Sequence, residues 1–101
     1  MSAERIVWAV RQEFDLDVTE LFGSTRERRV AEARFIVFDL LRGEGYSLKK
    51  IGQLFGRNHT TVMSGLKRLE DLLATDKRYK ARYEHIKRNI RIHEKEERKS
   101  R

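Results

Sequence analysis

A run of short polar residues, 58–61, carries the side chains of this sequence with the clearest chemical use. Asn58 can cap a helix through its side-chain oxygen. His59, Thr60 and Thr61 would then occupy the first turn of that helix. Hydroxyl, imidazole and amide groups at this place can approach base edges, and the exposed N–H groups of a helix start favour phosphate. The predicted chemistry is therefore recognition of DNA through hydrogen bonds.

Basic and hydroxyl side chains close to this run extend the polar surface. Ser64 and Lys67 lie on the same helical face as Thr60, nearly opposite an apolar stripe at positions 62, 66 and 69. Arg57 precedes the helix and can reach the DNA backbone or a guanine edge. We expect four of these residues to contact the DNA backbone: Arg57, Ser64, Lys67 and, on the preceding helix, Lys49.

The segment that positions these side chains, residues 47–69, has the pattern of a helix-turn-helix. Two short amphipathic helices are joined by a tight turn, and the second helix would lie in the major groove. Gly52 and Gly56 stand where the two helices touch and where the turn needs a positive φ. Ile51, Phe55 and Val62 supply the apolar contact between the helices.

The remaining sequence predicts an all-α fold of six helices. We expect helices at residues 3–14, between a cap at Asp17 and a stop at Gly23, from a start within 24–29 to about 42, from 47 to 56, from 58 to about 73, and from a cap at Asp76 onward. After Ile92 the sequence HEKEERKSR has no apolar face. We therefore predict one domain, residues 1–92, followed by a flexible charged tail, 93–101.

Length, charge and composition limit the class of protein. A chain of 101 residues has room for one domain, and the absence of cysteine excludes disulfides and thiolate-rich metal sites. The net charge is +7; residues 1–65 carry 10 basic and 9 acidic residues, and residues 66–101 carry 13 and 7. This balance favours an anionic partner. No apolar run is long enough for a membrane span and no signal-peptide pattern occurs, so we expect a cytoplasmic, nucleoid-associated protein.

The sequence IGQLFGRNHTTV, residues 51–62, resembles the signature of the C-terminal DNA-binding domain (domain IV) of the bacterial replication initiator DnaA. STRERRVAEARFIVFDLL resembles the basic loop and long helix of that domain, whose fold is of the Trp-repressor-like type. The resemblance implies recognition of a short asymmetric box in duplex DNA. It implies base contacts by His59, Thr60, Thr61 and Asn58 in the major groove, a minor-groove contact by Arg34, and phosphate contacts by Arg26, Arg28 and Arg29.

Three departures from the family pattern stand out. Asn58 replaces an acidic residue that helps to read a base, so the preferred base is expected to differ. Glu32 stands where the family often has a basic residue. The chain contains no Gly-Lys pair, which excludes a Walker A loop, and we expect a stand-alone domain without the ATPase part.

Three hypotheses follow for the function. The first is sequence-specific binding of double-stranded DNA, by a monomer, in control of replication initiation or transcription. The second is an adaptor that contacts the replication initiator or the replicative helicase. The third is a transcriptional regulator that dimerises through its first or last helix. An enzyme is not expected, because no nucleophile–base pair, phosphate loop or metal cluster is present. No metal or cofactor is expected, since His85 and His93 lack a third ligand nearby.

Overall fold

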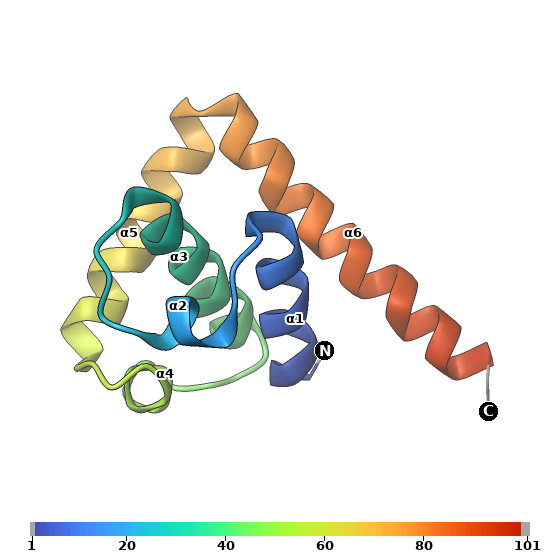
Figure 1. Cartoon of the computed structure of the whole chain (residues 1–101), viewed down its shortest axis with the longest axis horizontal. Coiled ribbons are helices and arrows are strands. Elements are labelled where there is room, and N and C mark those ends of the chain that lie inside the picture. The colour runs from blue at the N-terminus through green and yellow to red at the C-terminus, as the bar shows by residue number, and fades with distance from the viewer. Residues whose placement is uncertain (1, 100–101) are drawn as a thin grey trace.

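Six α-helices make up the chain in this computed structural model, which describes residues 2–99. They are α1 (Ala3–Phe14), α2 (Val18–Phe22), α3 (Arg28–Gly43), α4 (Leu48–Leu54), α5 (His59–Thr75) and α6 (Lys77–Lys99). Figure 1 shows α4 at one end of the molecule and α6 running along α1 and projecting beyond it. The predicted all-α fold with six helices is confirmed. Across residues 2–99, no helix has the length and apolar character needed to cross a membrane.

The helix starts follow from local hydrogen bonds that the sequence predicted. Asp17 accepts the backbone N–H of Glu20 at 2.7 Å, and the Glu20 carboxylate accepts the backbone N–H of Asp17 at 3.1 Å, which completes a capping box. Asn58 and Asp76 each accept the backbone N–H three residues further on, at 3.1 and 3.0 Å. These bonds satisfy N–H groups that have no partner within the helix itself.

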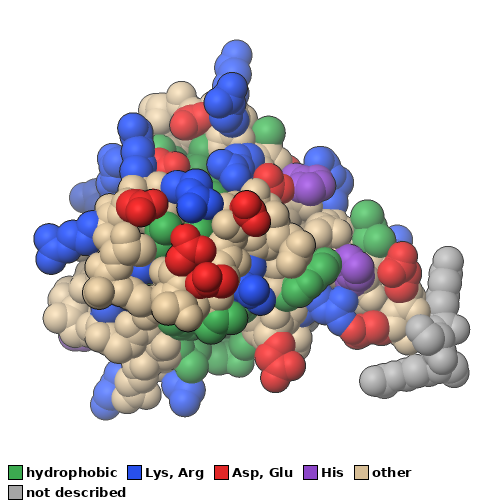
Figure 2. Space-filling model, in the orientation of Figure 1, with side chains coloured by type: hydrophobic (Ala, Val, Ile, Leu, Met, Phe, Trp, Pro, Cys, Tyr) green, Lys and Arg blue, Asp and Glu red, His purple; other side chains and the backbone are tan. Residues whose placement is uncertain are grey.

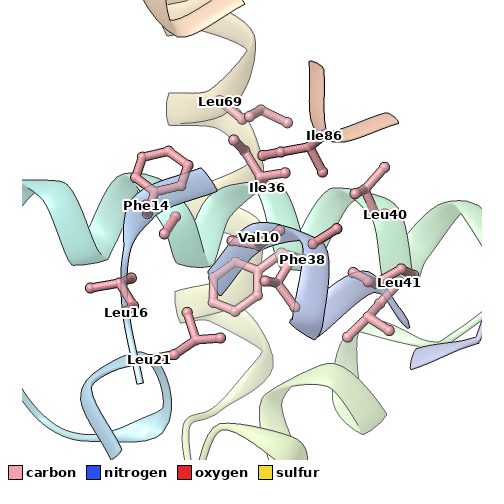
Figure 3. Packing of buried hydrophobic residues seen from close by; sticks show 14 of the residues in the cluster. Val10, Phe14, Leu16, Leu21, Ile36, Phe38, Leu40, Leu41, Leu69 and Ile86 are labelled. Carbon is pink, nitrogen blue, oxygen red and sulfur yellow. The ribbon is translucent and has the colours of Figure 1, made fainter. Parts of the chain in front are cut away.

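The core is built around α3, which is buried over most of its circumference. Five apolar residues at helical spacing form its main buried stripe: Val30, Ala33, Val37, Leu40 and Leu41. Ile36 and Phe38 are buried as well and widen this apolar face, while Phe35 beside them is only half-buried. Figure 3 shows side chains from α1, α3, α5 and α6 meeting here, among them Phe14, Leu69 and Ile86. The helix-turn-helix packs against this core, since Ile51, Phe55 and Val62 belong to the same cluster of buried residues.

Two tyrosines of α6 attach this helix to α3. The Tyr79 hydroxyl donates to the backbone oxygen of Glu32 at 2.6 Å, and the Tyr83 hydroxyl donates to the Asp39 carboxylate. Burial raises the pKa of Tyr79, and the nearby charges of Glu32 and Asp39 raise it further. Burial also raises the pKa of Tyr83, as does its hydrogen bond to Asp39. Both hydroxyl groups are therefore held in the neutral form.

The interface between α1 and α6 combines charge pairs with ring contacts. Arg82 donates to the backbone oxygen of Glu13 at 2.9 Å, and its Nε lies 3.4 Å from the Glu13 carboxylate. The same carboxylate contacts Nδ1 of His85. The Arg82 guanidinium also lies over the Phe14 ring, 3.9 Å from its centroid. These contacts fix α6 against α1 within one chain.

The last helix continues to Lys99, through residues 93–99 of the segment that the sequence predicted to be a flexible tail. Residues 93–99 lack glycine and proline and are rich in strong helix formers. They also make contacts that charge patterning does not reveal: the His93 and Trp8 rings pack nearly perpendicular with their centroids 4.7 Å apart, and Glu97 pairs with Arg5. Flexibility of this segment stays a prediction, and residues 100–101 lie outside the described residues.

Candidate nucleic-acid interface

Two glycines allow α4 and α5 to meet at close range. A Cβ atom on Gly52 would lie 2.5 Å from the backbone oxygen of Arg57 and 3.2 Å from the carbonyl carbon of Asn58, so no side chain fits unless the turn moves. Gly56 has a φ of +64°, in the left-handed region that favours glycine. The backbone N–H of Arg57 donates to the Gly52 oxygen at 2.8 Å and closes the turn. The predicted roles of both glycines are confirmed.

The first two turns of α5 present a polar face to solvent. Of the seven residues that the sequence singled out on and before this helix, Arg57 is half-buried and the other six are exposed: Asn58, His59, Thr60, Thr61, Ser64 and Lys67. Val62 and Leu69 are buried on the opposite side, and Leu66 is half-buried. Lys49 on α4 is exposed as well. The geometry therefore leaves these side chains accessible to a ligand, and their contacts with DNA remain a prediction.

The loop between α2 and α3 brings basic side chains beside the start of α5. Arg26 is exposed and makes no hydrogen bond or ion pair in the part of the chain that the structure describes. The Arg28 side chain is 81% exposed, and its Nε lies 3.3 Å from the Glu32 carboxylate, one helical turn further on. An exposed pair of this kind contributes little to stability and can exchange for phosphate. Arg26 and Arg28 therefore suit the predicted phosphate contacts.

Arg29 is placed differently from its two neighbours. Its Nη1 donates to the backbone oxygens of Phe14 and Asp15, and its Nη2 lies 3.7 Å from the Glu20 carboxylate. These bonds turn the side chain toward the corner between α1 and α2. A phosphate contact by Arg29 would have to compete with them, because the same donors serve both. The structure thus separates Arg29 from the pair formed by Arg26 and Arg28.

Arg34, for which the family resemblance implied a minor-groove contact, lies largely buried, with 5% of its surface exposed. Its guanidinium donates to four backbone oxygens, at Leu21 (2.7 Å), Thr25 (2.6 Å), Glu20 (3.0 Å) and Gly23 (2.8 Å). The last carbonyl groups of a short helix have no partners within it, and a planar fork of N–H donors satisfies several at once. In this conformation Arg34 holds the loop, and a minor-groove contact by its guanidinium would have to compete with these four bonds.

Arg57 joins the loop to the turn of the helix-turn-helix. Its Nη2 donates to the Gly23 oxygen at 2.9 Å, the same oxygen that accepts from Arg34, and its Nη1 donates to Phe55 at 3.2 Å. Burial lowers the pKa of Arg34, and the charge of Arg57 lowers it further. The sequence predicted Arg57 as a backbone contact and missed this positioning role. The unpaired carbonyl group of Gly23, just past the end of α2, was the sequence signal for such a role. Only the tertiary fold, however, brings both arginines to that oxygen.

An open cavity of about 460 Å³ lies between the basic loop and α5. Ser24, Thr25 and Arg26 line it from the loop, and Arg57 and Thr61 line it from the helix-turn-helix. Its walls therefore carry hydroxyl and guanidinium groups from both segments. The loop and the start of α5 consequently form one continuous polar surface, which neither segment would form alone.

Charge is distributed unevenly over the surface that contains these elements. In the view of Figure 2, Lys and Arg side chains line the left, upper and lower edges of the molecule, and several lie in the middle and on the right. Asp and Glu side chains lie mainly in the middle and on the right of the same view. Among residues 2–99, no three His, Asp or Glu side chains come together as a metal ion would require. The net charge of +7 attracts a polyanion to the molecule as a whole.

Comparison with known proteins places this fold. The family model for the bacterial DnaA protein helix-turn-helix matches residues 3–69, more than half of the chain. The chain belongs to this family. The family is a DNA-binding helix-turn-helix, and double-stranded DNA is the partner that membership indicates. The matched range ends inside α5 and thus contains the whole of the candidate interface up to Leu69.

Curated relatives agree with the family model. The chain is 41% identical over 83 residues to the chromosomal replication initiator protein DnaA of Thermomicrobium roseum, which covers 80% of this chain and 18% of that protein. It is 46% identical over 70 residues to DnaA of Leifsonia xyli subsp. xyli, covering 67% of this chain and 15% of the relative. It is 39% identical over 88 residues to DnaA of Mycobacteroides abscessus, covering 86% of this chain and 17% of the relative. The chain thus spans less than a fifth of these relatives.

Proposed function

We propose that this protein binds a short asymmetric box in double-stranded DNA, of the kind that DnaA reads, and acts in the control of replication initiation or of transcription. The observation that carries the proposal is the exposed run of residues 58–61 at the start of α5, next to the exposed Arg26 and Arg28. Base reading and phosphate contact require these two surfaces side by side. The site of action is then the nucleoid.

The two surfaces have different tasks. Arg26 and Arg28 neutralise phosphates, which supplies affinity for any sequence and makes binding depend on salt. His59, Thr60 and Thr61 lie where the N-terminal residues of a recognition helix contact base edges. Arg34 is left out of the base readers, because its donors are used by four carbonyl oxygens.

One copy of the chain is proposed to bind one box. The contacts of Glu13, Arg82 and His85 that hold α6 against α1 are made within one chain, so this packing needs no second copy. An asymmetric box also suits a single reading head, since a two-fold dimer would read a palindrome.

Paired substitutions test the proposal. Thr61→Ala should reduce the preference for the box over a scrambled duplex by about tenfold, since a lost base contact is worth about 1–3 kcal/mol. Arg28→Ala should weaken binding to both duplexes equally and reduce the salt slope by about 1. Fluorescence anisotropy of labelled duplexes over a salt series measures both effects. If Thr61→Ala left the preference unchanged, the assignment of the reading helix would be wrong.

A further inference from the structure

The side chain of Asn58 has one polar atom fully occupied by its own chain. Oδ1 accepts the backbone N–H of Thr61 at 3.1 Å and the Thr61 hydroxyl at 3.3 Å, and it also accepts the Thr60 hydroxyl. A backbone N–H can only donate, so it requires the oxygen of the amide at this position and not the nitrogen. The capping bond thus fixes which way the amide points.

The nitrogen of the same amide, in contrast to the oxygen, makes no hydrogen bond within residues 2–99. Asn58 is exposed, and its Nδ2 has no hydrogen-bond partner in the described part of the chain. Its two hydrogens are therefore available to a ligand. The Thr60 and Thr61 hydroxyls donate their only hydrogen to Oδ1, so they present lone pairs outward. The start of α5 consequently offers amide donors at position 58 and acceptors at positions 60 and 61.

We infer that Asn58 selects a base whose major-groove edge offers acceptors, guanine above all, and rejects cytosine at the same position. This inference rests on the proposed function and gives the base preference of that interface. The usual pairing of asparagine with adenine uses Oδ1 to accept from N6 and Nδ2 to donate to N7. Here Oδ1 already has three donors, so that pairing is blocked.

The edges of the four bases determine the order of preference. Guanine presents two adjacent acceptors, N7 and O6, to the two hydrogens of Nδ2. Thymine presents one acceptor, O4, beside a methyl group, and adenine presents N7 beside a donor. Cytosine presents only the N4 donor, which would face the Asn58 donors with neither group satisfied. We expect guanine to be preferred over cytosine by about fivefold or more at the position that Asn58 reads.

Two substitutions change the outward group and keep the cap. Asn58→Asp keeps an oxygen for the backbone N–H and replaces the outward donors with an acceptor; aspartate is as good a cap as asparagine. Asn58→Ser keeps a cap and removes the outward group. Ser47→Asp is a matched control, because Ser47 caps α4 in the same way, accepting from Lys50 at 3.0 Å, and gains the same charge away from α5. Circular dichroism checks that each variant is folded.

Selection of bound duplexes from a randomised pool, followed by competition anisotropy with all four base pairs at each position of the box, gives the preference of each variant. We expect the wild type to prefer guanine at one position, Asn58→Asp to prefer cytosine there, and Asn58→Ser to be indifferent. Ser47→Asp should bind every duplex more weakly and keep the wild-type preference. A box preference that is identical in wild type, Asn58→Asp and Asn58→Ser would overturn the inference alone. If the wild type showed no sequence preference, the proposed function would fail as well.

Discussion

Replacing Arg34 with methionine should destabilise the whole domain. Methionine keeps the apolar stem but removes the guanidinium that serves four carbonyl oxygens at the end of α2 and in the following loop. These oxygens cannot find new partners within α2, because they lie at its last turn and beyond. The loss therefore leaves buried or half-buried acceptors unsatisfied, which costs more than the bonds themselves contribute.

The magnitude follows from the burial of each bond. The bond to Leu21 is buried and involves a charged donor, which gives about 1.5–3 kcal/mol. The three bonds to Thr25, Glu20 and Gly23 are partly buried, and water can replace the donor there. Together they should contribute a similar stabilisation, about 1.5–2 kcal/mol. The free energy of unfolding should thus fall by about 3–5 kcal/mol. For a domain of this size, Tm should fall by more than about 10 °C.

Urea denaturation followed by far-UV circular dichroism measures this change. Arg34→Lys should fall between wild type and Arg34→Met, because one ammonium group can serve only some of the four oxygens. Arg26→Met is the matched control, since Arg26 is exposed and has no partner in residues 2–99, and it should change stability by less than about 0.5 kcal/mol. An Arg34→Met variant as stable as wild type, yet without base discrimination, would refute the structural role and restore Arg34 as a base reader.

The remaining predictions concern the turn and the two buried hydroxyl groups. Gly52→Ala should lower the free energy of unfolding by about 1–3 kcal/mol in urea denaturation, because its Cβ would meet the Arg57 oxygen at 2.5 Å. Gly43→Ala is the control and should be neutral, since there is open space around its Cβ. Equal effects of the two substitutions would contradict the close packing of the turn. Since the folded pKa values of Tyr79 and Tyr83 lie above the unfolded value of 10.0, the unfolded chain loses these protons first, so stability should fall as pH rises above 10.0. Denaturation at pH 9 and 11 should show a smaller fall for Tyr79→Phe and Tyr83→Phe than for wild type, and identical falls would show that these hydroxyls are not protected.

Local signals in the sequence predicted most of the elements, because each helix start depends on a side chain a few residues away. Asp17, Asn58 and Asp76 cap helices as expected, and the demands on Gly52 and Gly56 could be inferred from the turn alone. The end of α6 could not be predicted in this way. Residues 93–99 have no apolar face, and their contacts with Trp8 and Arg5 exist only after α1 and α6 have packed.

The candidate site shows the same division between local and tertiary information. The exposure of residues 58–61 follows from helical periodicity, so it could be predicted. The roles of Arg34 and Arg57 could not, since both depend on where the Gly23 carbonyl lies in space. An arginine next to a core stripe can reach outward to a ligand or inward to unpaired carbonyls, and only the folded chain decides between them.

The anchoring of the basic loop has a consequence for recognition. The backbone oxygen of Gly23 accepts from Arg34 on α3 and from Arg57 in the turn, so the loop and the start of α5 are held to each other before any ligand binds. Preorganised phosphate contacts lower the ordering cost of binding. The spacing between the proposed phosphate contacts and the proposed base contacts would then be set by the protein itself.

The most direct test of DNA recognition is the ratio of two affinities. Anisotropy of the full chain with a duplex that carries a DnaA-type box, and with the scrambled duplex, should be measured over a salt series. We predict a preference for the box of more than about 100-fold at physiological salt, with the same salt slope for both duplexes, since both share the phosphate contacts. Equal affinity for the two duplexes, falling steeply with salt, would contradict box recognition and leave only the attraction of a basic surface for a polyanion.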